Sequence, residues 1–192
     1  MPISKATNSV DYVNIKRNVP VYVFTRINDR VNYLRLGDFS ASTKTLAESN
    51  LFYNRIKDSL NTANLIVDLR NNGGGGFKNS KKFLKLLQKY KGNKYVLINN
   101  RTFSNAEEFV VELQKEKNVL TLGQQTNGTL TYGSNYGKHT PIGEGRYRIY
   151  MTDMKDKGGY LTYEEVGIAP QVLLENDADW IEKVVSLIED KK

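Results

Sequence analysis

The stretch LIVDLRNNGGGG, residues 65–76, decides the fold class of this chain. Its first five residues, Leu65–Leu69, are almost all apolar and predict a short buried strand, which the run of glycines then ends. A helix is predicted soon afterwards, over Ser80–Tyr90, because its large apolar residues recur at helical spacing. Strand, loop and helix in this order form the repeating unit of an α/β fold.

The same alternation continues along most of the chain. The first two predicted strands are joined by a polar turn at Asn28 and Asp29, which indicates a hairpin. Strands that alternate with helices favour parallel pairing with right-handed crossovers, so we expect an α/β fold with a mixed sheet. The other predicted strands are Val21–Arg26, Val31–Leu36, Lys94–Ile98, Val119–Gly123 and Arg146–Thr152, and the other predicted helices are Thr43–Asn61, one that starts near Ser104, and Asp177–Glu189.

Length and composition are those of one globular domain, with 192 residues of which 39% are hydrophobic and 26% charged. The absence of cysteine excludes disulfides and thiolate metal sites, and a single histidine excludes a zinc site built from several histidines of one chain. No apolar run approaches the roughly 18 residues of a membrane helix, and the first residues lack the apolar region of a signal peptide. These features leave the compartment open.

A net charge of +7 raises the question of nucleic-acid binding. The Lys and Arg residues are scattered, however, and their densest group, between Lys78 and Lys91, falls on the polar face of a predicted helix. A solvated helix face is the simpler interpretation. The sequence has no zinc finger, basic zipper or aromatic RNA-binding motif. Nucleic-acid binding, which would be strongly salt-dependent, is therefore the weakest of three functional hypotheses.

The glycine run lies between a strand and a helix, where phosphate-binding loops also lie. A GxGxxG motif that began at Gly73 would need glycine at position 78, where Lys78 stands, and a P-loop would need Gly-Lys followed by Ser or Thr. The sequence therefore predicts no nucleotide site here. Four glycines instead supply uncovered backbone N–H groups, which can stabilise an oxyanion, while a mobile turn is an equal alternative.

The segment RTFSNAEEF, residues 101–109, allows two interpretations of Ser104. Ser104 and Glu107 have the spacing of a capping box, and an apolar stripe from Ala106 to Leu113 predicts that a helix starts there. The same position suits a nucleophile, because a helix N-terminus presents free N–H groups and partial positive charge to an oxyanion. Spacing alone does not separate the cap from the nucleophile.

Several of these segments, in this order, resemble the motifs of the C-terminal processing and tricorn-type serine peptidases. LIVDLRNNGGG resembles that family's Asp-Leu-Arg-Asn-Asn-x-Gly-Gly signature, and RTFSNAEEF resembles its nucleophile segment. Three further matches, YLRLGDF, LGQQTNG and YEEVGIAPQ, lie at residues 33–39, 122–128 and 163–171. The resemblance implies a crotonase-like ββα spiral core, which is also found in modules of interphotoreceptor retinoid-binding protein. The tricorn-like branch is the nearer one.

The resemblance covers about residues 19–190. It implies a peptidase-like core domain over residues 19–192, preceded by a flexible N-terminal segment, residues 1–18. Family members usually carry a helical or peptide-binding domain upstream. The abrupt start of this chain favours an excised domain, extracytoplasmic in that case, with such an upstream domain as a partner.

Position by position, the resemblance implies roles for the residues of two loops. Ser104 would be the nucleophile, and backbone N–H groups of Asn105 and of Gly74 or Gly75 would form the oxyanion hole. A donor of this kind lowers the barrier of known acyl-transfer reactions by about 3 kcal/mol.

The general base is where the chain departs from the family. Glu164 matches the glutamate of the tricorn-like catalytic set, with Glu165 as a competing candidate, but Thr129 stands where processing peptidases have a lysine. The histidine of tricorn-like members lies upstream of the matched region. The lone histidine, His139, could be the base only if its strand folds over Ser104.

The resemblance thus implies the core of a serine peptidase, in which Ser104 attacks a peptide carbonyl and forms an acyl-enzyme that water hydrolyses, without metal or other cofactor. The alternative is a non-catalytic module that binds a peptide or a hydrophobic ligand on the same fold, which the missing base favours. Lys138 is a weaker candidate for the base, because such a lysine must be desolvated and its neighbours are polar. Gln171 also replaces the aspartate usual in the last motif.

Overall fold

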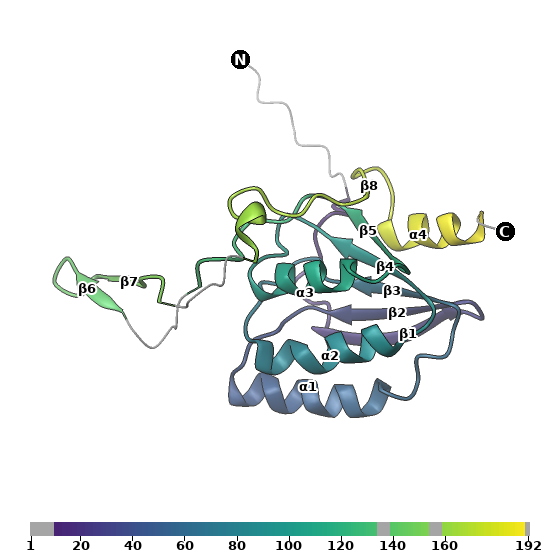
Figure 1. Ribbon diagram of the computed structural model, residues 1–192, viewed down its shortest axis with the longest axis horizontal. Coiled ribbons are helices and arrows are strands. Elements are labelled where there is room, and N and C mark those ends of the chain that lie inside the picture. Colours follow the sequence, from purple (N-terminus) through teal and green to yellow (C-terminus); the bar gives the residue numbers. More distant parts are fainter. Residues whose placement is uncertain (1–9, 134–138, 154–158, 191–192) are drawn as a thin grey trace, which may run out of the picture.

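The computed structural model describes residues 10–133, 139–153 and 159–190. It has the α/β architecture that the sequence predicts, with a six-stranded sheet in the order β1-β2-β3-β4-β5-β8 (Figure 1). The first two strands form the predicted antiparallel hairpin, and every other neighbouring pair in this sheet is parallel. The strands are β1 (Tyr22–Asn28), β2 (Val31–Leu36), β3 (Asn64–Asp68), β4 (Asn93–Ile98), β5 (Val119–Gly123), β6 (Thr140–Ile142), β7 (Tyr147–Ile149) and β8 (Val172–Leu173), and the helices are α1 (Thr43–Ile56), α2 (Phe77–Lys89), α3 (Asn105–Gln114) and α4 (Trp180–Glu189).

Helices cover both faces of this sheet. α1, α2 and α3 lie on one face, where Phe39, Phe83 and Phe109 belong to the larger apolar cluster. α4 covers the other face, where Trp180 and Val184 belong to a second cluster. Because helices cover both faces of the sheet, the residues of β2, β3 and β4 are buried almost throughout, whichever face they point to.

The boundaries differ from the prediction at a few elements. α1 ends at Ile56, five residues before the predicted Asn61, and the residues that follow include three poor helix formers, Asp58, Ser59 and Asn61. The short strand β8 and a 3₁₀ turn at Leu161–Tyr163 were not predicted, since two or three residues carry no periodic signal. β8 exists because Val172 pairs with Leu122 of β5. Among the described residues, no helix is both long enough and apolar enough to span a membrane.

A buried charged cluster joins β2 and β3 to the start of the glycine loop. The Asp68 carboxylate is fully buried and accepts hydrogen bonds from Arg70 at 2.7 Å and from the Tyr33 hydroxyl at 2.9 Å, while Arg35 lies 3.8 Å away. Burial alone would raise the pKa of Asp68, but the charges of Arg70 and Arg35 and the hydrogen bonds from Arg70 outweigh it and lower the pKa. Arg70 also lies over the Trp180 ring, 5.3 Å from its centroid. The backbone before the glycines is thereby fixed to both β2 and α4.

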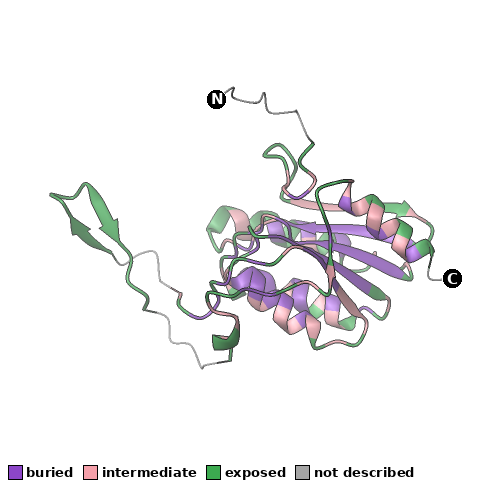
Figure 2. Ribbon diagram, turned by 90° about the horizontal axis from the view of Figure 1, so that it is seen from above, coloured by how far each residue is buried: buried purple, intermediate pink, exposed green. Residues whose placement is uncertain are grey.

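Two peripheral segments differ in their contacts with this core. Residues 11–15 belong to the segment expected to be flexible, yet Val13 is buried and the Tyr12 N–H donates to the Asn176 side chain at 2.7 Å. The hairpin of β6 and β7 extends away from the sheet, and residues 139–153 are all exposed (Figure 2). Residues 11–15 therefore contact the core, whereas residues 139–153 are exposed to solvent.

Candidate active site

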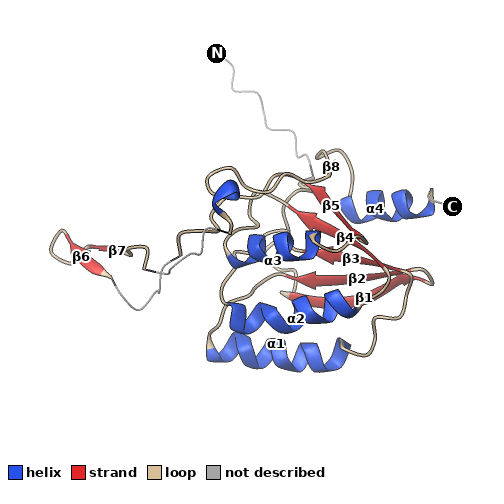
Figure 3. Cartoon of the chain, viewed as in Figure 1, coloured by secondary structure: helices blue, strands red, loops and turns tan. Residues whose placement is uncertain are grey.

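Two loops that follow neighbouring strands meet beside the sheet. The glycine loop follows β3, and residues 99–104 follow β4, so both leave the carboxyl ends of adjacent parallel strands (Figure 3). The Phe103 N–H donates directly to the Asn72 carbonyl oxygen at 3.1 Å. Ligands of open α/β sheets bind at this kind of position, outside the carboxyl ends of the strands.

Gly74 and Ser104 touch across this junction. A Cβ atom added to Gly74 would lie 2.8 Å from the Ser104 Cβ and 2.9 Å from the Asn105 backbone nitrogen. Gly74 also has a φ of +78°, which side chains rarely allow. Only glycine at position 74 permits the two loops to approach this closely. The glycine loop and Ser104 are therefore neighbours, as the sequence analysis expects.

Backbone hydrogen bonds tie the glycine loop to the segment after β2. The Phe39 N–H donates to the Gly74 carbonyl oxygen at 3.0 Å, and the Gly76 N–H donates to the Phe39 carbonyl oxygen at 2.8 Å. These two bonds form a parallel bridge between Phe39 and Gly75. These bonds orient the backbone on both sides of Gly75.

Ser104 has a strained backbone at a sharp turn into α3. Its φ of 57° and ψ of −133° are unusual for a residue other than glycine, and the residue is partly exposed. A nucleophile at a sharp strand-to-helix turn displays its hydroxyl in a similar way. The predicted capping box is present: the Ser104 N–H donates to Glu107 Oε2 at 2.9 Å, and the Glu107 N–H also donates to the Ser104 carbonyl oxygen at 2.8 Å.

The free backbone donors near Ser104 are those of Asn105 and Gly75. In the part of the chain that the structure describes, neither N–H has a protein acceptor, whereas the Gly74 N–H donates to Asn72 Oδ1 at 2.9 Å. Gly75 is exposed and Asn105 is the first residue of α3. The Asn105 Oδ1 atom is also buried without a hydrogen-bond partner among the described residues, and such atoms in native proteins usually have a reason to be there.

Glu107 organises a third loop around this site, which sequence analysis did not foresee. Its fully buried carboxylate accepts from the Ser104 N–H and from three groups of the loop after β5: the Thr126 hydroxyl at 2.6 Å, the Gly128 N–H at 2.7 Å and the Thr129 N–H at 3.0 Å. The partial positive charge at the start of α3 also favours a carboxylate here. The capping-box spacing identified the residue but not its second set of partners.

Glu164 holds the chain just beyond that loop. One oxygen of its partly exposed carboxylate accepts from the Leu130 N–H at 3.0 Å and from the Thr131 N–H at 2.7 Å. Thr131 Oγ1 is the other buried side-chain atom without a partner among the described residues. Glu165, the competing candidate, is exposed with a φ of 62°. Of the two glutamates, Glu164 is the one whose carboxylate binds the backbone of this segment.

The structure does not bring His139 to Ser104. His139 lies directly before β6 in the exposed stretch 139–153, where its ring centroid is 5.7 Å from that of Tyr150. Lys138, the weaker candidate, lies outside the described residues. Within residues 10–133, 139–153 and 159–190, no group of three or more His, Cys, Asp or Glu side chains is arranged to hold a metal ion.

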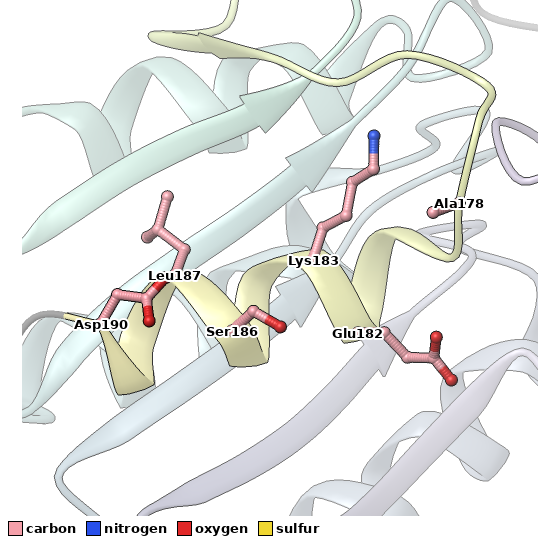
Figure 4. Close-up of a pocket in the computed structure, with 6 residues that line it drawn as sticks. All are labelled: Ala178, Glu182, Lys183, Ser186, Leu187 and Asp190. Carbon is pink, nitrogen blue, oxygen red and sulfur yellow. The ribbon is translucent and has the colours of Figure 1, made fainter.

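A surface depression of about 580 Å³ lies elsewhere, along α4 on the opposite face of the sheet from α3 (Figure 4). Its lining mixes charges of both signs with small and aliphatic side chains. Its lining residues are Ala178, Glu182, Lys183, Ser186, Leu187 and Asp190. The depression plays no part in the site around Ser104.

Comparison with known families matches two overlapping stretches of this chain, residues 30–94 and 76–174, to the model of peptidase family S41. Together they span most of the chain. The chain belongs to peptidase family S41. A search of curated proteins gives no significant match.

Several solved structures share the fold. The photosystem II D1 C-terminal processing protease aligns with a TM-score of 0.56 and 20% identity over 90% of this chain and 53% of its own. The tricorn protease aligns with a TM-score of 0.62 and 18% identity over 84% of this chain and 18% of its own. A lipoprotein from Streptococcus agalactiae aligns with a TM-score of 0.63 and 17% identity, over 91% and 71% of the two chains. The chain thus spans about half the length of the D1 processing protease, and this likeness concerns the fold.

Proposed function

We propose that this chain is the core of a serine peptidase that hydrolyses peptide bonds through an acyl-enzyme on Ser104. Membership of a peptidase family supports the reaction class. The observation that carries the choice of residues is the contact of Gly74 with Ser104 and Asn105. It supports a site in which a carbonyl beside the Ser104 hydroxyl would also face backbone donors.

The proposed reaction uses those donors when charge develops. The Ser104 oxygen attacks the carbonyl carbon and passes its proton to a base, while the carbonyl oxygen becomes an oxyanion. The Asn105 N–H and a glycine-loop N–H would bind this oxyanion, and Gly75 is the better glycine because its N–H is not already bonded. The tetrahedral intermediate then expels the amine, which takes the proton, and water later releases the acid from Ser104.

The base remains the open element of the proposal. Thr129 cannot act as one near neutral pH, and Glu164 is engaged with two backbone N–H groups. We assign Glu164 the role of positioning residue for the segment after Thr129. His139 stays a candidate base, which would require its exposed hairpin to approach Ser104.

Labelling with a fluorophosphonate tests the proposal, because such a probe reacts with activated serines. We expect covalent labelling of the wild-type chain that Ser104→Ala abolishes. Ser186→Ala is the matched control, since Ser186 is an exposed serine on α4; this variant should label like the wild type. Labelling that survives in Ser104→Ala, or that depends on Ser186, would contradict the assignment of the nucleophile.

A non-catalytic binding module is the second candidate. The unpartnered Asn105 Oδ1 favours it, because a bound peptide N–H could satisfy that buried acceptor without any chemistry. A folded chain that resists the probe but binds peptides equally well as wild type and as Ser104→Ala would support this function. Peptide cleavage that requires Ser104 would exclude it.

A further inference from the structure

The helix α2 presents a row of lysines to solvent. Lys78, Lys81, Lys85 and Lys89 are three or four residues apart, so at 100° per residue they share one side of the helix. All four are exposed, and the buried residues of α2, such as Leu87, lie on the opposite side. We call these four residues the α2 lysine face.

Among the described residues, no acidic side chain pairs with this face. Residues 69–106 contain nine Lys and Arg residues and none of the 21 Asp and Glu residues. Within residues 10–133, 139–153 and 159–190, none of the four lysines forms an ion pair. The neighbouring helix α3 has acidic side chains, but Glu112 binds Lys115 and Glu108 accepts from the Asn105 amide.

The lysines of this face destabilise α2. Lys81 and Lys85, and likewise Lys85 and Lys89, are like charges four residues apart, which repel on a helix surface. Lys78 lies in the first turn, where the helix dipole disfavours a cation, and the N-cap residue, Gly76, provides no side-chain cap. Folding alone gives no reason for so many lysines, which points to a partner with negative charge.

The shape around the lysine face suits a flat partner. α2 lies between α1 and α3 in a layer of helices (Figure 1), so it cannot enter a DNA major groove, about 12 Å wide, as a protruding helix would. Large apolar side chains are exposed in the same layer: Leu51 on α1 is 73% exposed and Phe77 at the start of α2 is 54% exposed. Lysines beside exposed apolar residues are typical of surfaces that bind lipid headgroups.

We propose that the α2 lysine face docks this protein on an anionic lipid surface. The ammonium groups would lie at the level of the phosphates, with Phe77 at the boundary of the acyl chains. Because the glycine loop leads directly into α2, the face starts beside Ser104. Docking would hold the site at the edge of the membrane contact. The proposal does not depend on peptidase activity.

Vesicle sedimentation tests the proposal with the Ser104→Ala protein, so that proteolysis plays no part. Vesicles contain phosphatidylcholine alone or with about a third phosphatidylglycerol, in about 0.1 M salt, where exposed charges still attract at about 10 Å. We expect binding only to the anionic vesicles. Changing all four lysines of the α2 lysine face to Gln should weaken binding by about 600-fold, from about fivefold for each lysine.

A matched variant carries Lys16→Gln, Arg17→Gln, Lys115→Gln and Lys117→Gln, which removes four exposed positive charges elsewhere. It should retain vesicle binding within about threefold. Equal losses of binding in the two variants would show that only net charge matters and would overturn the proposal. Failure of the wild-type protein to bind anionic vesicles would overturn it as well. Binding of duplex DNA, but not of vesicles, that depends on the same four lysines would assign the face to nucleic acid instead. Gln keeps helix propensity, so unfolding temperatures should confirm that both variants fold.

Discussion

Ser104 and Thr129 donate their backbone N–H groups to the same oxygen atom, Oε2 of Glu107, at 2.9 and 3.0 Å. Their two nitrogens therefore lie no more than about 6 Å apart, although 25 residues separate them in sequence. Position 129, where the processing peptidases have their lysine, thus lies beside the candidate nucleophile. By that resemblance, a threonine occupies the position of the base in the processing peptidases.

Thr129→Lys should therefore create or raise hydrolytic activity. The Thr129 side chain is exposed, so a lysine can be accommodated, and its amine could take the Ser104 proton. General-base catalysis is typically worth 10² to 10⁴ in rate, and about tenfold is a cautious expectation for a lysine that is only partly desolvated. The rate of fluorophosphonate labelling measures this, and it should rise with pH as the lysine loses its proton.

Two control variants separate base catalysis from other effects of that change. Thr129→Met has a similar length without an amine and should leave the labelling rate unchanged. Thr129→Lys combined with Ser104→Ala should not label at all. A rate increase shared by Thr129→Met would show that the amine is not responsible.

Glu107→Gln should destabilise the protein by about 2–4 kcal/mol. The four groups around this buried carboxylate are all donors, and an amide nitrogen in place of one oxygen would face donors with its own hydrogens. Urea unfolding measures the loss. Glu112→Gln is the control: it removes a partly exposed ion pair with Lys115, while the amide oxygen can still accept from the Tyr160 hydroxyl, so it should cost less than about 1 kcal/mol.

Gly74→Ala should remove activity and destabilise the fold, by about 2 kcal/mol or more. The added methyl group would meet Ser104 and Asn105 at less than 3 Å, on a backbone with positive φ. Gly73→Ala is the matched change one residue earlier, where the nearest obstacle is the Phe103 ring at 3.1 Å and the side chain can move. Similar unfolding free energies for the two variants would contradict the close contact at Gly74.

Asp68→Asn should cost about 3–5 kcal/mol at neutral pH, because it leaves two buried arginines without their counter-charge. The folded pKa of Asp68 is lowered below its ordinary value of 3.8. Its contribution is therefore complete above about pH 5 and is lost as the pH falls through the folded pKa. The difference in unfolding free energy between wild type and variant should shrink below about pH 4. Trp180 fluorescence can follow unfolding, since Arg70 lies over that ring.

Asp29→Asn is the control for the buried cluster. Asp29 pairs with Arg26 at 3.1 Å, but its side chain is fully exposed, so the change should cost less than about 1 kcal/mol and show little dependence on pH. A pH-independent difference for Asp68→Asn would argue against an ionised Asp68 in the folded state.

The strands and helices of the core could be predicted from sequence because burial leaves a periodic signal. β2 and β5 have the predicted bounds, and the inward residues of α2, Phe83, Leu84 and Leu87, are buried as expected. The contact between the glycine loop and Ser104 followed from topology, since adjacent parallel strands deliver their loops to the same edge.

The remaining details depend on contacts between distant segments, which spacing does not record. Glu107 carries the signal of a cap, and only the folded chain brings Gly128 and Thr129 to its carboxylate. Likewise, the sequence does not show that the Gly74 N–H donates to Asn72 Oδ1, which occupies a donor that an oxyanion would otherwise use. The roles of Ser104, Glu164, Gly75, Asn105 and His139 in catalysis stay predictions.

The most direct measurement is a crystal structure of the wild-type chain after reaction with a phosphonate probe. The account predicts phosphorus bonded to the Ser104 oxygen, and a phosphoryl oxygen about 3 Å from the Asn105 nitrogen and from a backbone nitrogen of the glycine loop. A phosphonate attached to another residue, or a phosphoryl oxygen directed away from both donors, would contradict it.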